Sequence, residues 1–335
     1  MSLLFITNDL CAAHLGDVAH PEQPARLTSV GQGLLRADLG DAVEIVEAPL
    51  APLEAITTVH ASEMVEQVKQ HALAGGASID ADTIVTAASF QAARFAAGAG
   101  LEAIERLRSG EAATAFCAVR PPGHHATAAS SMGFCLFNNV AVAARALADA
   151  GERVAIVDYD AHHGNGTQDI FYRDPRVLFI SFHQWPAYPG SGRIDESGTG
   201  AGVGSTINVP LPQGATGDVY LQAWDRIAAP QIDAFGPTWL LLSAGFDAHR
   251  ADPLTNMGLS AGDFVALTSR VLGVSTPERR IAFLEGGYNL DALTETSAAV
   301  FSTLAGQTFE TEAETNAGPG AHVVDEVVEH FAAIT

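Results

Sequence analysis

The sequence predicts an α/β protein in which helices cover both faces of one largely parallel sheet, a single-domain three-layer α/β/α architecture. Short apolar runs alternate with longer segments of helical periodicity along the 335 residues. The chain is 47% hydrophobic and 17% charged, which is a globular composition, and neither a composition shift nor an internal repeat divides it. Clusters of reactive side chains follow several of the apolar runs, as expected where parallel strands end beside a ligand crevice.

Strands are expected wherever a short apolar run lies between turn residues. They cover residues 3–7, 43–47, 113–119, 153–158, 177–182, 205–209, 239–243 and 281–284. Amphipathic periodicity predicts helices over 24–39, 61–74, 87–108, 138–150, 219–235, 262–272 and 290–304. The first three elements therefore form a βαβ opening, in which the helix is entered through Pro24.

Two segments have no convincing period. Residues 185–204 are rich in Gly, Pro and Ser and are expected to form a functional surface loop. The polar residues 306–322 are expected to form a second loop before a C-terminal helix at 323–335. We therefore expect one domain over 1–335, with its motifs between about 20 and 305.

Charge and cysteine content limit the partners and the compartment. The chain has 17 Lys and Arg against 39 Asp and Glu, a net charge of -22, which disfavours binding to nucleic acid or to anionic membranes. Such a surface could attract a cationic substrate, although solubility alone explains it. Cys11, Cys117 and Cys135 show no disulfide or CxxC spacing. With no signal peptide and no run long enough to span a bilayer, a cytoplasmic location is expected.

Every reactive cluster comes directly after a predicted strand. These clusters are Arg120-Pro121-Pro122-Gly123-His124-His125, the pair Asp160 and His162, Asp247, and Glu285-Gly286-Gly287-Tyr288. Because the carboxyl ends of parallel strands meet at one edge of a sheet, the clusters are expected to share one crevice.

The segment Val154 to Gly166 predicts half of a metal site. Asp160 and His162 lie two residues apart, so both side chains point to the same side of the chain. Asp247 supplies a third ligand from another strand end, leaving one position open for water, as in catalytic zinc sites. Two carboxylates and one imidazole could also accept iron or cobalt.

The adjacent histidines His124 and His125 are candidates for acid and base chemistry beside that metal. Asp158 and Asn165 can each accept a hydrogen bond from one imidazole and fix its tautomer. An aspartate raises a histidine pKa more than a neutral asparagine does, so the two histidines are expected to differ in charge at neutral pH.

Several long motifs in the same order resemble the zinc-dependent histone deacetylase family, which has the arginase/deacetylase fold. They are His20-Pro21-Glu22-Gln23-Pro24-Ala25-Arg26-Leu27, Arg120 to Ala126, Gly133-Phe134-Cys135-Leu136-Phe137-Asn138-Asn139, Asp158 to Thr167, and Glu285 to Tyr288. The resemblance covers nearly the whole chain from about His20. Asn165 in place of an aspartate is similar to the class II branch, in which bacterial members and acetylpolyamine amidohydrolase-type proteins are found.

The resemblance implies a role for each reactive residue. Zinc would be bound by Asp160, His162 and Asp247. His125, paired with Asn165, would act as general base and acid, and His124, paired with Asp158, would be its electrostatic partner. Tyr288 would point its hydroxyl at the substrate carbonyl as an oxyanion stabiliser.

The resemblance also implies a narrow channel for an acyl-lysine stem, lined by Gly133, Phe134, Tyr188 and Leu254. Tyr188 departs from the phenylalanine that the family more commonly has. Leu254 stands where polyamine-specific relatives place a glutamate, which weakens a polyamine assignment. Arg26 would lie beneath the zinc near an exit path for acetate, and the exposed acids Asp80 and Asp82 lie where a rim residue could hold the substrate backbone.

One or two structural potassium ions are implied by the same resemblance. The first site would use Asp158, Asp160, His162, Ser181 and Phe182, mainly through backbone carbonyls. The second would use carbonyls of Phe171, Asp174, Val177 and Tyr220.

The expected function is hydrolysis of an N-acyl lysine side chain in a protein or peptide, or of a similar acylated amine, by metal-activated water. Alternatives are an acetylpolyamine or other small-molecule amidohydrolase, and a non-catalytic acyl-ligand or partner-binding module. A two-metal ureohydrolase would need bridging carboxylates that the sequence lacks. The sequence leaves a homo-oligomer open.

Overall fold

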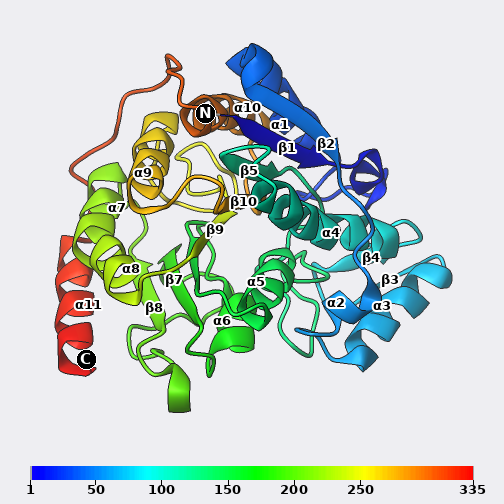
Figure 1. The fold of residues 1–335 in the computed structure, drawn as a ribbon, viewed down its shortest axis with the longest axis horizontal. Coiled ribbons are helices and arrows are strands. Elements are labelled where there is room, and N and C mark those ends of the chain that lie inside the picture. Colours follow the sequence, from blue (N-terminus) through cyan, green and yellow to red (C-terminus); the bar gives the residue numbers. More distant parts are fainter. Residues whose placement is uncertain (1, 335) are drawn as a thin grey trace.

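A computed structural model of the chain describes residues 2–334 and shows an eight-stranded, wholly parallel central sheet (Figure 1). The strand order is β2-β1-β5-β10-β9-β6-β7-β8. In chain order the strands are β1 (Leu3–Thr7), β2 (Val43–Glu47), β5 (Thr114–Cys117), β6 (Val154–Asp158), β7 (Val177–Gln184), β8 (Thr206–Leu211), β9 (Trp239–Ala244) and β10 (Arg280–Leu284).

Helices cover both faces of this sheet and complete three layers (Figure 1). One layer contains α1 (Ala25–Ala37), α7 (Gly217–Ala223), α8 (Ala229–Phe235), α9 (Ala261–Val274), α10 (Leu290–Leu304) and α11 (Ala321–Ile334). The other contains α3 (Ser62–Leu73), α4 (Ser89–Arg108), α5 (Asn139–Asp149) and α6 (Asn165–Phe171). The predicted three-layer α/β/α fold is therefore confirmed.

The strands are apolar throughout because both of their faces are buried. In β6, Ala155 and Val157 pack into the core beneath α1, α7 and α9, whereas Val154 and Ile156 pack into the core beneath α4 and α5. This alternation separates two hydrophobic cores on opposite faces of the sheet. The central strands are therefore buried on both faces, and the loops that leave their ends start from this buried sheet.

Each predicted strand and helix is present, with ends shifted by a few residues. The predicted helix 219–235 is a continuous run in which a π-helical turn, Trp224–Ala228, joins α7 to α8. Sequence periodicity missed α6, the short α2 (Leu53–Ile56), and a hairpin of β3 (Gly76–Ser78) and β4 (Ile84–Thr86), because each is too short for a periodic signal. The C-terminal helix was predicted to reach residue 335, which lies outside the described residues.

The four strands β5, β10, β9 and β6 are neighbours in the sheet and are all parallel. Their carboxyl ends therefore open at the same edge, where the loops carrying the predicted reactive residues meet. Within residues 2–334, no helix is both long and apolar enough to cross a membrane.

Candidate active site

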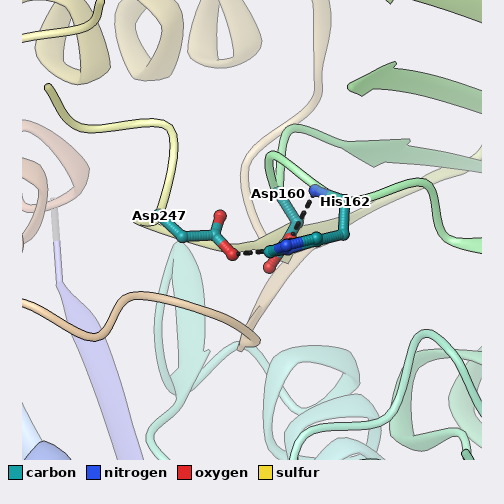
Figure 2. A group of neighbouring side chains, drawn as sticks. All are labelled: Asp160, His162 and Asp247. Atoms are coloured by element: carbon teal, nitrogen blue, oxygen red, sulfur yellow. Dashed lines mark hydrogen bonds and ion pairs between the residues drawn. The ribbon is translucent and has the colours of Figure 1, made fainter. Parts of the chain in front are cut away.

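Asp160, His162 and Asp247 converge at this edge and form a group that can hold a metal ion (Figure 2). Asp160 and His162 follow β6, and Asp247 follows the adjacent strand β9. His162 Nδ1 lies 2.9 Å from Asp247 Oδ2 and 3.1 Å from Asp160 Oδ1. One ligand atom from each residue lies within 4.8 Å of the others, which is the spacing of donors around a single ion.

The two carboxylates are held by backbone N–H groups, and two glycines pack closely against them. Gly286 N–H donates to Asp160 Oδ2 at 2.7 Å, and Ala161 N–H donates to Asp247 Oδ1 at 2.8 Å. A Cβ atom at Gly286 would lie 2.2 Å from Asp247 Oδ2, and one at Gly245 would lie 2.1 Å from Asp160 Oδ2. Only glycine fits at these two positions.

Electrostatics also favour a cation at this point. Asp160 and Asp247 are fully buried, and burial together with the Asp160 charge raises the pKa of the Asp247 carboxyl to about 7. Two buried carboxylates this close repel each other unless a cation lies between them. Two oxygens, one imidazole nitrogen and an open side suit a divalent ion of the zinc type, so the residues present fit the metal that the sequence predicts.

His124 and His125 stack beside this group, with ring centroids 4.0 Å apart. His124 Nδ1–H donates to Asp158 Oδ2 at 2.9 Å, and His125 Nδ1–H donates to Asn165 Oδ1 at 2.7 Å. His125 therefore presents Nε2 as its basic nitrogen, whereas His124 Nε2 lies 3.8 Å from Asp160 Oδ1. The two predicted pairs are both present.

The two histidines differ in charge. Although burial opposes protonation, the carboxylates of Asp160 and Asp158 raise the pKa of His124 to about 10. Burial, followed by the charges of His124 and His162, lowers the pKa of His125 well below its usual 6.5. At neutral pH His124 is thus a cation and His125 is a neutral base, which are the two states expected from their different partners.

Tyr288 closes the opposite side of the site. Its ring meets the Phe134 ring edge to face at 5.8 Å, and the Arg26 guanidinium carbon lies 5.0 Å from its centroid. Burial raises the pKa of Tyr288 well above 10. The hydroxyl therefore stays protonated and can donate a hydrogen bond.

A cavity of about 220 Å³ connects these groups to the surface. It is lined by Asp82, His125, Gly133, Phe134, His162, Tyr188, Leu254 and Tyr288. Tyr188 and Leu254 are 40% and 41% exposed and mark its mouth. A side chain at Gly133, whose φ is +55°, would lie 2.5 Å from the His125 ring, so glycine at this position keeps the channel open.

Residues 20–304 match the histone deacetylase domain family, which is 285 of the 335 residues. This chain belongs to the histone deacetylase family. It is 39% identical over 300 residues to a probable deacetylase of Archaeoglobus fulgidus, an alignment covering 88% of this chain and 83% of that protein. It is 38% identical over 300 residues to a histone deacetylase-like amidohydrolase of Pseudomonas aeruginosa, covering 88% and 78%.

The fold agrees with this family. The crystal structure of the HDA15 HD domain superposes with a TM-score of 0.91 at 33% identity, covering 99% of this chain and 94% of that one. This chain is thus a histone deacetylase-family hydrolase of the deacetylase/amidohydrolase type, in a family that generally depends on a metal.

Not every predicted site residue of this chain lines the cavity. Arg26 is fully buried behind Tyr288, where its guanidinium donates to the Gly287 carbonyl at 2.6 Å and to the Glu285 carbonyl at 2.5 Å. It forms an ion pair with Glu22 at 3.1 Å, and Glu22 in turn pairs with Arg120. Arg26 therefore supports the tyrosine loop from behind.

Two residues of the candidate site were not assigned roles from the sequence. Glu285 Oε2 accepts hydrogen bonds from Gly123 N–H at 2.7 Å and from His124 N–H at 3.1 Å, so it shapes the histidine turn. Asp252 accepts a hydrogen bond from the backbone of Tyr288. Because Glu285 belongs to the Glu-Gly-Gly-Tyr motif, the sequence could have indicated a role for it. No sequence feature near Asp252 indicates its hydrogen bond to Tyr288, which lies 36 residues away.

The residues expected to hold potassium are partly brought together. In the first set, Asp158 and Ser181 are register partners on β6 and β7. Asp160 N–H donates to the Asp158 carboxylate, and His162 N–H donates to the Asp160 carboxylate. Phe182 follows Ser181 on β7.

In the second set, Asp174 N–H donates to the Phe171 carbonyl and Val177 N–H donates to the Asp174 carbonyl, so these three lie in one turn. Assigning Tyr220 to the second set was wrong. Tyr220 lies on α7 in the core on one face of the sheet, whereas Phe171 and Val177 lie in the core on the other face. The sheet itself separates them.

Proposed function

We propose that this chain is a zinc-dependent deacetylase that hydrolyses N-acyl lysine side-chain amides of proteins or peptides. One observation carries the proposal. A metal-ligand group, a neutral histidine, a charged histidine and a protonated tyrosine are gathered around one narrow channel. A binding module would need the channel but would not need a base and an oxyanion donor together.

The three ligands Asp160, His162 and Asp247 would hold the zinc ion. When bound, zinc would supply Lewis acidity to the substrate carbonyl and to the attacking water. His125 accepts the proton of that water at Nε2, because Asn165 holds its proton on Nδ1. His124, kept charged by Asp158, stabilises the negative charge that develops. His125 then returns the proton to the leaving amine.

The Tyr288 hydroxyl donates to the carbonyl oxygen as its negative charge grows. This interaction strengthens in the transition state and therefore accelerates the reaction. The channel between Gly133, Phe134, Tyr188 and Leu254 fits an unbranched alkyl stem. Leu254 is apolar and offers no charge for a second ammonium group, which favours an acyl-lysine over an acylated polyamine. The carboxylate in the cavity lining is that of Asp82.

The test is turnover of a fluorogenic acetyl-lysine peptide by purified wild type, His125→Ala and Tyr288→Phe, each loaded with zinc. We expect both variants to lose on the order of a hundred-fold or more in kcat. His71→Ala serves as the control, since His71 lies on α3 outside the site. Acetylputrescine and acetylspermidine complete the substrate panel. Unchanged turnover in both site variants would refute the assigned roles, and faster turnover of the polyamines would reassign the substrate.

We also propose that monovalent cations, potassium among them, bind at the backbone turn of Asp158, Asp160, His162, Ser181 and Phe182, and at that of Phe171, Asp174 and Val177. The support is that Asp158 and Ser181 are register partners on β6 and β7, and that Phe171, Asp174 and Val177 lie in one hydrogen-bonded turn. Exchange of potassium for choline during thermal unfolding tests the ion sites, and an unchanged melting temperature would argue against them.

The buried, unpaired cysteines fit a reducing cytoplasm, which is the compartment that we propose.

A further inference from the structure

Asp252 lies between the catalytic tyrosine and the channel wall and contacts both through their backbones. One carboxylate oxygen, Oδ2, accepts a hydrogen bond from Tyr288 N–H at 2.7 Å and a longer one from Asn289 N–H at 3.4 Å. The other, Oδ1, accepts from Leu254 N–H at 2.9 Å. The two oxygens of one side chain thus connect two segments that line the channel.

Asp252 differs from an ordinary turn-forming aspartate in two respects. The Leu254 contact alone would be a local turn, but the Tyr288 contact reaches across 36 positions of the chain. The side chain is only 7% exposed, and among residues 2–334 the ion pairs do not include it. A buried carboxylate satisfied by backbone N–H groups alone is costly, which points to a requirement for two acceptor atoms.

The Tyr288 loop is held from its other side as well. Arg26 donates to the Glu285 and Gly287 carbonyls, while Asp252 accepts from the next two N–H groups along the chain. A cation therefore holds the carbonyls and an anion holds the N–H groups of the same short loop. These contacts fix the backbone of Tyr288, whose hydroxyl must lie within a few tenths of an ångström of the substrate oxygen.

We infer that Asp252 is a positioning residue that fixes the Tyr288 hydroxyl relative to the channel wall at Leu254. Only a substrate that lies against this wall then reaches the hydroxyl that stabilises the oxyanion. This inference rests on the proposed deacetylase function. It requires a carboxylate, because an asparagine has a single carbonyl acceptor, and its NH₂ group would face one of the two backbone N–H donors.

The test compares zinc-loaded wild type, Asp252→Asn and the control Asp291→Asn in peptide deacetylation. Asp291 is an exposed acid three residues beyond Tyr288. For Asp252→Asn we expect kcat to fall about 10- to 100-fold while KM changes less than about threefold, because the tyrosine is displaced but the channel still admits the stem. Asp252→Glu keeps two acceptors and should recover part of the loss. It also replaces the asparagine variant if that variant does not fold.

A double-mutant cycle with Tyr288→Phe separates positioning from general disruption, with residual turnover measured by single-turnover assays at excess enzyme. If Asp252 acts through the hydroxyl, adding Asp252→Asn to Tyr288→Phe should lower kcat less than about twofold further. The inference is overturned if Asp252→Asn alone stays within twofold of wild type, or if its full effect persists in the Tyr288→Phe background. If the proposed function itself is wrong, the result is different: the wild-type protein will not hydrolyse any acetyl-lysine peptide.

Discussion

The floor and the mouth of the channel are built in different ways. At the floor, Asp160, Asp247, His124 and His125 are almost fully buried, and each is held by at least one hydrogen bond. At the mouth, Tyr188 and Leu254 are about two-fifths exposed and belong to long loops. The difference indicates that the floor fixes the chemistry, where small displacements are costly, whereas the mouth can vary and select among substrates.

Removal of the metal should give the largest effect, because it acts on the floor. Dialysis against a strong chelator should lower kcat at least about a thousand-fold, more than the loss of one oxyanion donor. Turnover of the acetyl-lysine peptide is measured before chelation, after it, and after zinc is restored. Restoration by zinc in proportion to bound metal is the expected result, and full activity in metal-free protein would contradict the floor assignment.

Gly133→Ala tests the contact of Gly133 with His125 of the floor and Tyr188 of the mouth. The new Cβ would lie 2.5 Å from the His125 ring at a φ of +55°, so the base must move or the loop must shift. A displacement of about 1 Å at a catalytic group can cost on the order of a hundred-fold in kcat/KM. The matched control is Gly31→Ala on α1, which should retain full activity because the added Cβ would meet no atom within 4 Å. Equal activity of the two variants would show that the channel tolerates the methyl group.

The stability of the folded protein should fall in acid because of His60, whose ring hydrogen-bonds the backbone beside the floor. Its Nδ1–H donates to the Thr127 carbonyl, and its Nε2 accepts from Asn138 N–H, so the native ring is neutral. Burial lowers the pKa of His60 to about 4. Its unfolded pKa of about 6.5 is higher, so stability is present above pH 6.5 and is lost as the pH falls toward 4.

Between pH 7 and pH 5 this single group should remove about 2 kcal/mol of unfolding free energy. Denaturant unfolding at both pH values measures the loss. His60→Gln should lose less stability over this interval than wild type, and the control His71→Gln should behave like wild type. Identical losses in all three proteins would contradict a neutral, pH-sensitive His60.

Leu254→Glu should give the smallest effect, because it changes only the mouth. A carboxylate on this wall can pair with a second ammonium group, so the ratio of kcat/KM for acetylspermidine over acetyl-lysine peptide should rise about 10-fold. The kcat for the peptide should change by less than about threefold. Leu73→Glu on α3 is the control, with the same charge change at a 72% exposed position that does not line the channel. A large loss of kcat would mean that the mouth also sets the chemistry.

Much of the floor was predictable because its residues lie at strand ends. Asp160 and His162 share a side of the chain by their spacing alone, and Asp247 follows an apolar strand that could be recognised locally. The pairs of His124 with Asp158 and of His125 with Asn165 were also expected, and both are present. Periodicity could not find α6 or the β3–β4 hairpin, since three to seven residues are too few for a repeating signal.

The sequence by itself determined the α/β class, the eight strands, and the reactive residues that follow four of them. Local spacing and hydrophobic pattern are enough for these, because each depends on residues close together in the chain. Only the tertiary structure decided that β5, β10, β9 and β6 are neighbours, that Tyr220 lies across the sheet from Phe171, and that Asp252 holds Tyr288. Those relations depend on strand order and on hydrogen bonds between distant segments, and no local pattern in the chain encodes them.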